Sequence, residues 1–346
     1  MKTIEQHLAG HALLGEELIL SPVDIYIESG IITAIEENPD VPQRWICPAL
    51  FNAHTHLGDT IAMDIGVSGD LAGLVTPPHG LKHRLLAAAP RHALIAGMRA
   101  SIEDMIGGGT AGCADFREGG QEGVSALHEA ADGLPFRPCI FGREGGEITA
   151  EGLGISSIRD IPDADRQVRE AKMAGKKIAF HAGERDSRDI DAAIAYDPDL
   201  IIHATHATRK QLRECAERDI AIAACPRSNW TLGVTSSARH PPLDLLEELG
   251  CRLCIGTDNV MFVPPDMLSE LAFTSTVYHL APVSLLRAAV RGSSLAGEPS
   301  FIRRGGKANL FTIDPGLSSL RFSRDPLATL VKRAPFAAIG KNVFNL

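Results

Sequence analysis

The stretch Pro48-Ala-Leu-Phe-Asn-Ala-His-Thr-His56 joins an apolar run to two histidines that are one residue apart. A short apolar run of this kind is typical of a strand buried on both faces, as in a parallel sheet covered by helices. The two histidines then stand where such a strand ends. This stretch therefore predicts a buried strand that carries polar groups at its carboxyl end.

The same texture repeats along the chain from residue 48 onward. Short apolar runs alternate with longer amphipathic stretches of helical period, and strands alternating with helices pair in parallel through helical crossovers. Eight units of this kind in about 250 residues predict an α/β protein with a (β/α)8, TIM-like barrel. The predicted strands are 46–54, 110–116, 136–142, 152–157, 176–182, 199–205, 219–225 and 251–257.

Both ends of the chain have β character instead. Residues 24–28 alternate between polar and apolar side chains, as a half-buried strand does, and 310–313 is another short apolar run. We predict a small β-sandwich domain built from residues 1–47 and 305–346. Residues 48–304 then form the barrel domain.

Composition limits the partners and the compartment. The 346 residues contain 34 Lys and Arg against 43 Asp and Glu, a net charge of −9, which argues against a nucleic-acid partner. No apolar run approaches the roughly 20 residues of a membrane span, and the first twenty residues lack the apolar core of a signal peptide. Seven cysteines, an odd number, lie mostly in apolar runs. We expect a cytoplasmic protein with a small-molecule substrate and no membrane partner.

Histidine and aspartate end four of the predicted strands. His54 and His56 end the first, His181 the fifth and Asp258 the eighth, and His203 ends the sixth. Catalytic groups of such barrels project from these ends. Since side chains alternate along a strand, His54 and His56 point to one face and can reach the same ion.

His181 and Asp258 complete a predicted metal site of three histidines and one carboxylate. Neutral imidazole and carboxylate suit Zn²⁺, so we expect one divalent ion, zinc by preference, with Fe²⁺ or Mn²⁺ as alternatives. A His-x-His pair alone is weak support, because such pairs are common on surfaces. The same pair with His and Asp at later strand ends is specific.

In combination these motifs give the chain a resemblance to the amidohydrolase superfamily, and within it to the cytosine deaminase-like, ATZ/TRZ-type branch of metal-dependent hydrolases. The resemblance spans nearly the whole chain. It is carried by Pro48 to His56, His181-Ala-Gly-Glu184, His203, Cys225-Pro-Arg-Ser-Asn229 and Gly256-Thr-Asp258. It implies a metal-dependent hydrolase with a (β/α)8 barrel, and homodimers are common among its members.

The resemblance also implies roles for single residues. Glu184 matches a glutamate that moves protons between the water, the substrate and the leaving amine. His203 matches a histidine that touches the attacking water or the developing oxygen charge; His206 is the competing residue of the same strand. Asp258 would bind the metal and accept the water proton. Ser228 and Asn229 match a turn that shapes the pocket.

Charged residues at two further strand ends are candidates for substrate binding. Arg117 and Glu118 follow the second predicted strand, and Arg143 and Glu144 follow the third. They could recognise a carboxylate, a phosphate or an amidine of the substrate. The alternative is that they form salt bridges with one another in the loop layer.

Two other features bear on the site. No lysine ends the third or fourth predicted strand, so a mononuclear site is favoured over a pair of metals bridged by a carboxylated lysine.

The long segment 57–80 could act as a lid, with Asp59, Asp64 and His79 as substrate contacts, or it could be an ordered surface loop.

Three functions remain open at this point. The first is a deaminase that replaces an amino group on a purine, pyrimidine or related amidine-type carbon and releases ammonia. The second is a mononuclear amide, imine or dehalogenating hydrolase that uses the same residues. The third is a non-catalytic metal-binding protein that has kept the fold. Neither the substrate nor the leaving group can be read from the sequence, because the fold hosts many chemistries.

Overall fold

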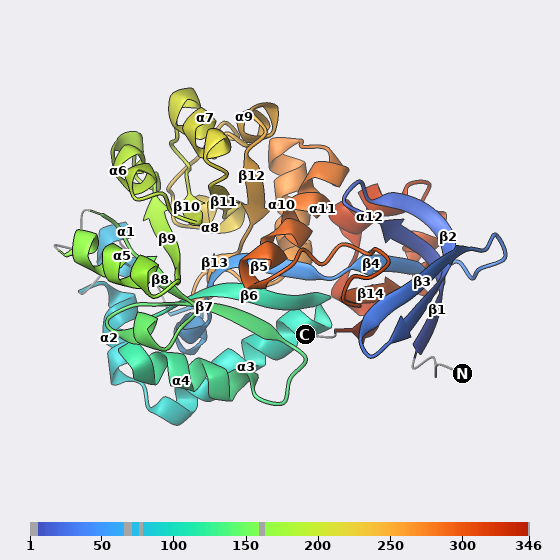
Figure 1. Ribbon diagram of the computed structural model, residues 1–346, viewed down its shortest axis with the longest axis horizontal. Coiled ribbons are helices and arrows are strands. Elements are labelled where there is room, and N and C mark those ends of the chain that lie inside the picture. The colour runs from blue at the N-terminus through green and yellow to red at the C-terminus, as the bar shows by residue number, and fades with distance from the viewer. Residues whose placement is uncertain (1–5, 66–70, 76–78, 159–162, 345–346) are drawn as a thin grey trace.

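The computed structural model describes residues 6–65, 71–75, 79–158 and 163–344. They form two sheets, one parallel with nine strands and one mixed with six (Figure 1). The parallel sheet is surrounded by helices and carries the site. The mixed sheet lies at one side, where the first strands of the chain meet the last.

The parallel sheet is the predicted TIM-like barrel. Its strands are β5 (Leu50–His56), β6 (Thr110–Arg117), β7 (Arg137–Gly142), β8 (Gly152–Ile155), β9 (Lys177–Ala182), β10 (Leu200–His203), β11 (Ala221–Ala224), β12 (Arg252–Ile255) and β13 (Asp258–Asn259). They pair in the order β12-β11-β10-β9-β8-β7-β6-β5-β13. Because β12 and β13 are consecutive in the chain, the sheet returns to its first strand, β5.

The last strand packs closely against β5 where it is interrupted between β12 and β13. Only Gly256 and Thr257 separate β12 from β13. A Cβ atom on Gly256 would lie 2.6 Å from the backbone nitrogen of His54, so glycine is needed where the last strand passes β5. The Thr257 N–H donates to the His54 carbonyl at 3.1 Å and to Asn52 Oδ1 at 3.0 Å. These bonds bring Asp258 beside the strand that carries the two histidines.

Twelve α-helices and seven 3-10 helices are found in the described residues. The α-helices are α1 (Leu71–Val75), α2 (Leu81–Ala88), α3 (Arg91–Gly107), α4 (Gly120–Ala131), α5 (Ala164–Met173), α6 (Ile190–Ala195), α7 (Arg209–Glu217), α8 (Pro226–Thr231), α9 (Leu243–Glu248), α10 (Met267–Tyr278), α11 (Pro282–Arg291) and α12 (Pro326–Arg333). The 3-10 helices are η1 (Leu57–Ala62), η2 (Gly146–Ile148), η3 (Ser187–Asp189), η4 (Gly292–Ala296), η5 (Pro315–Leu317), η6 (Ser319–Phe322) and η7 (Phe336–Ala338).

Alternate residues of the barrel strands pack on opposite faces of the parallel sheet. In β11, Ala221 and Ala223 belong to an apolar cluster made by seven strands and η4, whereas Ile222 belongs to the cluster shared with the helices. Ala179 of β9 lies in the first of these clusters, and Phe180 lies in the second. This two-residue period makes His181 project from the same side as Ala179.

The mixed sheet is built from both ends of the described chain. Its strands are β1 (Gln6–Leu14), β2 (Ile19–Glu28), β3 (Ile31–Glu37), β4 (Trp45–Pro48), β14 (Leu310–Ile313) and β15 (Ile339–Val343). They pair in the order β15-β14-β4-β1-β2-β3. In the part of the chain that is described, these strands form one sheet and not the two facing sheets of a sandwich. Ile302 and Ala308, which lie in the segment before β14, pack into the apolar cluster on one face of this sheet.

The predicted strand 46–54 is in fact two strands in two sheets. The change falls at Ala49, whose N–H donates to the carbonyl of Asn309 at 3.0 Å. The N–H of the next residue, Leu50, donates to Gly109 at 3.0 Å, next to the barrel strand β6. The run 45–56 is buried throughout, so its composition gives no sign of the change.

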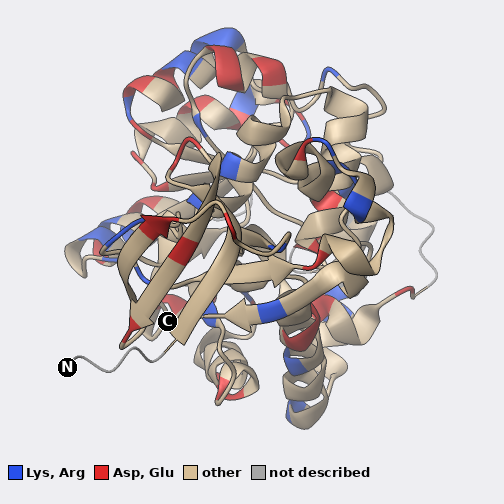
Figure 2. Cartoon of the chain, turned by 90° about the vertical axis from the view of Figure 1, so that its right-hand side faces the viewer, with Lys and Arg blue, Asp and Glu red and all other residues tan. Residues whose placement is uncertain are grey.

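Three further features concern the cysteines, the surface charges and the length of the helices. All seven cysteines are buried and carry free thiols. Lys and Arg lie among Asp and Glu on the outer helices (Figure 2). Of the helices described, none is both long and apolar enough to cross a membrane.

Candidate metal centre

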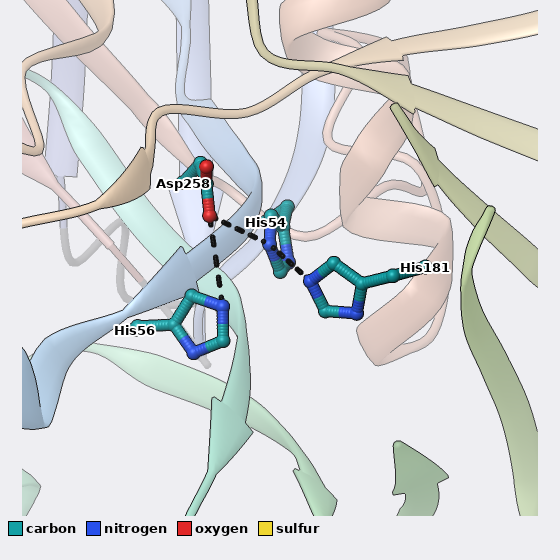
Figure 3. Close-up of side chains that lie close together, drawn as sticks. All are labelled: His54, His56, His181 and Asp258. Atoms are coloured by element: carbon teal, nitrogen blue, oxygen red, sulfur yellow. Dashed lines mark hydrogen bonds and ion pairs between the residues drawn. The ribbon is translucent and has the colours of Figure 1, made fainter. Parts of the chain in front are cut away.

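The four predicted ligands come together at the carboxyl ends of the barrel strands (Figure 3). His54 and His56 lie at the end of β5, His181 near the end of β9, and Asp258 starts β13. Each offers one ligand atom, and these atoms all lie within 4.8 Å of one another. This is the one cluster of three or more such side chains found in the described residues.

The contacts within the cluster are short. Nε2 of His54 lies 3.1 Å from Asp258 Oδ1 and 3.2 Å from Nε2 of His181. Nε2 of His56 lies 3.6 Å from the same Asp258 oxygen. Three imidazole nitrogens and a carboxylate oxygen therefore face a common space.

The outer nitrogens of two of these rings have hydrogen-bond partners, and those of His56 fix its tautomer. Nδ1 of His56 faces two acceptors, the Phe116 carbonyl at 3.2 Å and Glu118 Oε1 at 3.1 Å. Nδ1 of His181 lies 3.3 Å from an acceptor, the Ile155 carbonyl, and 3.4 Å from a donor, NH2 of Arg143. We assign the proton of His56 to Nδ1 because only a donor satisfies an acceptor, which leaves its Nε2 lone pair directed at the shared space.

The charges of the cluster suit a divalent cation. Burial lowers the pKa of His54 to about 4 and holds the pKa values of His56 and His181 well below the usual range, so the imidazoles are neutral. Burial raises the pKa of Asp258, but the hydrogen bond to His54 and the nearby imidazoles outweigh it, and the carboxylate stays ionised. Bare imidazole nitrogens and a carboxylate oxygen this close are the donor set that Zn²⁺ accepts.

Glu184 and His203 lie beside this cluster as a pair. Oε1 of Glu184 is 3.8 Å from Nε2 of His203, and the His203 side chain is 1% exposed. Burial raises the pKa of the Glu184 carboxyl, although His203 opposes the shift. His206, the competing residue of the same strand, instead packs against His240, with ring centroids 5.1 Å apart. The structure thus puts His203, and not His206, next to Glu184.

Helix α8 holds two of these side chains in place. Ser228 Oγ donates to Asp258 Oδ2 at 2.5 Å, so the other carboxylate oxygen faces the histidines. Asn229 Oδ1 lies 3.2 Å from Nδ1 of His203, and its amide donates to Thr205 Oγ1 at 2.9 Å. Ser228 and Asn229 were expected to shape the pocket, and here each orients a neighbour.

Two of the site residues have an unusual backbone conformation. His203 has a φ of 73° and Asp258 a φ of 63°, in the left-handed region that non-glycine residues rarely adopt. Such conformations cost free energy and persist where the surrounding structure imposes them. Both residues are also held at their side chains by hydrogen bonds from α8.

The charged residues at the next strand ends form ion pairs with one another. Arg117 donates to Glu118 at 2.7 Å, and Arg143 donates to Glu118 at 3.2 Å. Arg117 also lies 3.3 Å from Asp115. These contacts are those of the salt-bridge alternative, so a substrate contact by Arg117, Glu118 or Arg143 stays a prediction. Glu144, also predicted to bind substrate, is exposed and accepts from the Gly119 N–H at 3.1 Å.

Sequence reasoning missed the central cation of this network. Lys82, in the first turn of α2, is 3% exposed, and its Nζ lies 2.9 Å from both Asp59 and Glu118. Burial lowers the pKa of Lys82, but the two carboxylates outweigh it, and the ammonium is retained. Asp59, expected to contact substrate, is fully buried against this lysine, and burial raises its pKa to about 7. A lysine at the start of a helix gives no signal of such burial.

The segment predicted as a lid is described only in part. Its first residues form η1, with Asp59 buried and Asp64 exposed, and His79 is exposed just before α2. Residues 66–70 and 76–78 lie outside the described residues. A substrate contact by Asp64 or His79 stays a prediction.

Comparison with known proteins places this geometry in context. The family model described as Amidohydrolase family matches residues 45–146, and the model described as Adenosine deaminase matches residues 149–312. A candidate aminohydrolase from Methanothermobacter thermautotrophicus is 33% identical over 368 residues, which cover 94% of this chain and 93% of the relative. Together the two models span the barrel, and the relative extends over nearly the whole chain.

Solved structures share the fold at lower identity. A zinc-bound adenosine deaminase from Xanthomonas campestris has a TM-score of 0.77 and 17% identity, covering 98% of this chain and 91% of its own. A mutant atrazine chlorohydrolase from Arthrobacter aurescens, complexed with zinc and atraton, has a TM-score of 0.80 and 16% identity, covering 98% and 94%. At these identities the likeness establishes the architecture alone.

Proposed function

We propose that this chain, which belongs to the amidohydrolase superfamily, is a zinc-dependent deaminase that replaces an amino group on a purine, pyrimidine or related amidine-type carbon with oxygen. The observation that carries the proposal is the pair of buried His203 and half-buried Glu184 beside the His54, His56, His181 and Asp258 cluster. The adenosine deaminase model matches the part of the chain that contains this pair. The zinc in the two structural neighbours supports the choice of metal.

The cluster would hold the ion, and Glu184 would carry the proton. When bound, a divalent ion supplies Lewis-acid activation of a water molecule. Ammonia leaves readily only after its nitrogen has gained a proton, so the reaction needs a group that takes a proton from the water and delivers it to nitrogen. The raised pKa of the Glu184 carboxyl brings it closer to working pH, which suits both halves of that transfer.

The neighbouring side chains would manage the charge that develops on oxygen. Asn229 accepts at Nδ1 of His203, so Nε2 of His203 is the nitrogen that faces Glu184. An imidazole held in a water-poor site stabilises developing negative charge more strongly than it would in water. Ser228 holds one oxygen of Asp258 and so keeps the other directed at the histidines. The balance is one C–O bond formed, one C–N bond broken and ammonia released.

Ammonia release from a panel of substrates tests the proposal. The zinc-loaded protein is assayed with nucleobases, nucleosides, pterins and guanidino compounds, beside the Glu184→Gln variant. The control is Glu217→Gln, which makes the same change on the exposed face of α7. We expect release by the parent and the control, and loss in Glu184→Gln. Chloride release from chlorotriazines or amine release from amides, without ammonia, would overturn the proposal in favour of the other hydrolases.

A further inference from the structure

Helix α8 depends on a buried ion pair that lies outside the reacting groups. The Glu270 carboxylate, in the first turns of α10, accepts from the backbone N–H of Arg227 at 3.0 Å and from its Nε at 2.6 Å. Glu270 is completely buried, and the Arg227 side chain is 12% exposed. One carboxylate thus holds both the main chain and the side chain of a single α8 residue.

The Arg227 guanidinium also attaches α8 to the main chain just before α10. NH2 of Arg227 donates to the carbonyls of Pro264 at 2.8 Å and Asp266 at 3.0 Å, just before α10. A second tie joins the far end of α8 to the same helix, because Trp230 Nε1 donates to the Tyr278 hydroxyl at 3.0 Å. A helix of six residues has little stability of its own, so these ties determine its placement.

The residues directly after Arg227 are those that orient the site. Ser228 donates to Asp258, and Asn229 accepts from His203, so two adjacent residues of α8 control one metal ligand and one catalytic candidate. Neither Asp258 nor His203 shares a hydrogen bond or an ion pair with Glu270 among the contacts of the described residues. Among the described residues, hydrogen bonds therefore join Glu270 to them only through α8, while the negative charge of Glu270 also acts directly on Asp258.

We propose that Glu270 and Arg227 are a positioning pair that places Ser228 and Asn229, and through them orients Asp258 and His203. The inference rests on the proposed function for the role of His203. The metal affinity of the cluster does not depend on which substrate is used. Metal binding therefore tests the pair even if no deaminase activity is found.

The experiment is a double-mutant cycle on zinc affinity. Glu270→Gln, Ser228→Ala and the double variant are purified as full chains and freed of metal. Zinc dissociation constants are then measured by competition with a chromogenic chelator. Outer partners of metal ligands are typically worth about 10- to 100-fold in affinity, so we expect about tenfold weaker binding in each single variant. If Glu270 acts through Ser228, the double variant is no weaker than Ser228→Ala.

A spectroscopic readout separates positioning from general loss of stability. The absorption bands of the cobalt(II)-substituted protein report ligand geometry, and we expect them to shift in Glu270→Gln. The matched control is Glu248→Gln, which breaks the exposed pair with Arg209 at 2.7 Å and leaves α8 untouched. The control should keep the parent spectrum and the parent affinity.

Two outcomes would overturn the inference. One is a folded Glu270→Gln protein with parent zinc affinity and parent cobalt spectrum. The other is an additive cycle, in which Glu270→Gln weakens binding equally with and without the Ser228 hydroxyl. If Glu270→Gln does not fold, Arg227→Lys replaces it in the same cycle. That variant keeps the backbone bond and the charge but loses the Nε contact, and the same two outcomes decide.

Discussion

Glu118 lies directly behind His56. Its Oε1 atom is 3.1 Å from Nδ1 of the ring, while Nε2 on the opposite side is 3.6 Å from Asp258. A carboxylate in this position fixes the tautomer of a metal-binding histidine and raises the basicity of its other nitrogen. The residue expected to bind substrate therefore supports a metal ligand in this structure.

Neutralising Glu118 should weaken metal binding. In Glu118→Gln the carboxylate behind His56 is lost, and Lys82, Arg117 and Arg143 lose their common counter-ion. We expect zinc affinity to fall by about 10- to 100-fold, measured by chelator competition. Glu122→Gln is the control, since that side chain is 87% exposed on the adjacent helix α4. Equal affinities of Glu118→Gln and the parent would refute the role.

Removing the buried ammonium of Lys82 should destabilise the fold. Lys82→Met leaves Asp59 without the ammonium that pairs with it and Glu118 with one cation fewer. Breaking a buried ion pair in this way lowers the free energy of unfolding by about 3–5 kcal/mol. The loss is measured from urea unfolding curves in which the free energy of unfolding depends on urea concentration with the same slope in both proteins. The double variant Lys82→Met/Asp59→Asn should regain part of that loss because it removes the unpaired charge. A loss below about 1 kcal/mol in Lys82→Met would show that the network contributes little.

Activity should show an acid limb set by Glu184. Burial holds the pKa of this carboxyl above the ordinary value of about 4.3, so the base form disappears at a higher pH than for an exposed glutamate. We expect kcat/KM to fall as pH falls through that raised pKa. At the optimum, Glu184→Gln should lower kcat by about 10²- to 10⁴-fold. A pH profile flat down to pH 4 would contradict this assignment.

The raised pKa of Glu184 also predicts that the folded protein loses stability as pH rises, whereas activity falls as pH falls. A raised pKa means that the folded chain binds the proton more tightly than the unfolded chain, so stability falls as pH rises through the folded pKa. Glu184→Gln should therefore raise the melting temperature of the metal-free protein near pH 8. The gain should shrink as pH is lowered toward the ordinary glutamate pKa. A gain that is independent of pH would have another cause.

Metal should stabilise the protein through the four ligands. Zinc at 100 times its dissociation constant should add about 2.7 kcal/mol to the free energy of unfolding, and EDTA should remove the gain. In Asp258→Asn the cluster loses its single negative charge, so the melting temperature should respond far less to the same zinc concentration. An undiminished response in this variant would place the zinc elsewhere.

The strand ends could be predicted because their geometry is set by the backbone. The carboxyl ends of parallel strands meet at one edge, so His54, His56, His181 and Asp258 had to lie near one another once the eight strands were recognised. The two-residue period of a strand put His54 and His56 on one face. Predicting that the four ligands lie together did not require the position of any helix.

The surroundings of the ligands could not be predicted for the opposite reason. Lys82 is buried because α2 packs against η1 and brings the lysine to Asp59 and Glu118, and that placement is a tertiary property which the sequence around Lys82 does not encode. The choice between substrate binding and salt bridging at Glu118 also depends on which side chains reach it. The division at Ala49 was hidden because the residues on either side of it are buried and apolar.

The mixed sheet has a consequence for synthesis on the ribosome. Strand β4 runs into β5 and the metal histidines, yet one of its two neighbours is β14, which is translated only after the entire barrel. The strand that leads into the barrel, β4, thus lacks one of its two partners until β14 has been translated. Pairing between such distant segments is slow, and exposed strand edges attract other chains while they wait. Nascent chains stalled before residue 310 would therefore expose an open edge at β4 and be natural clients for chaperones.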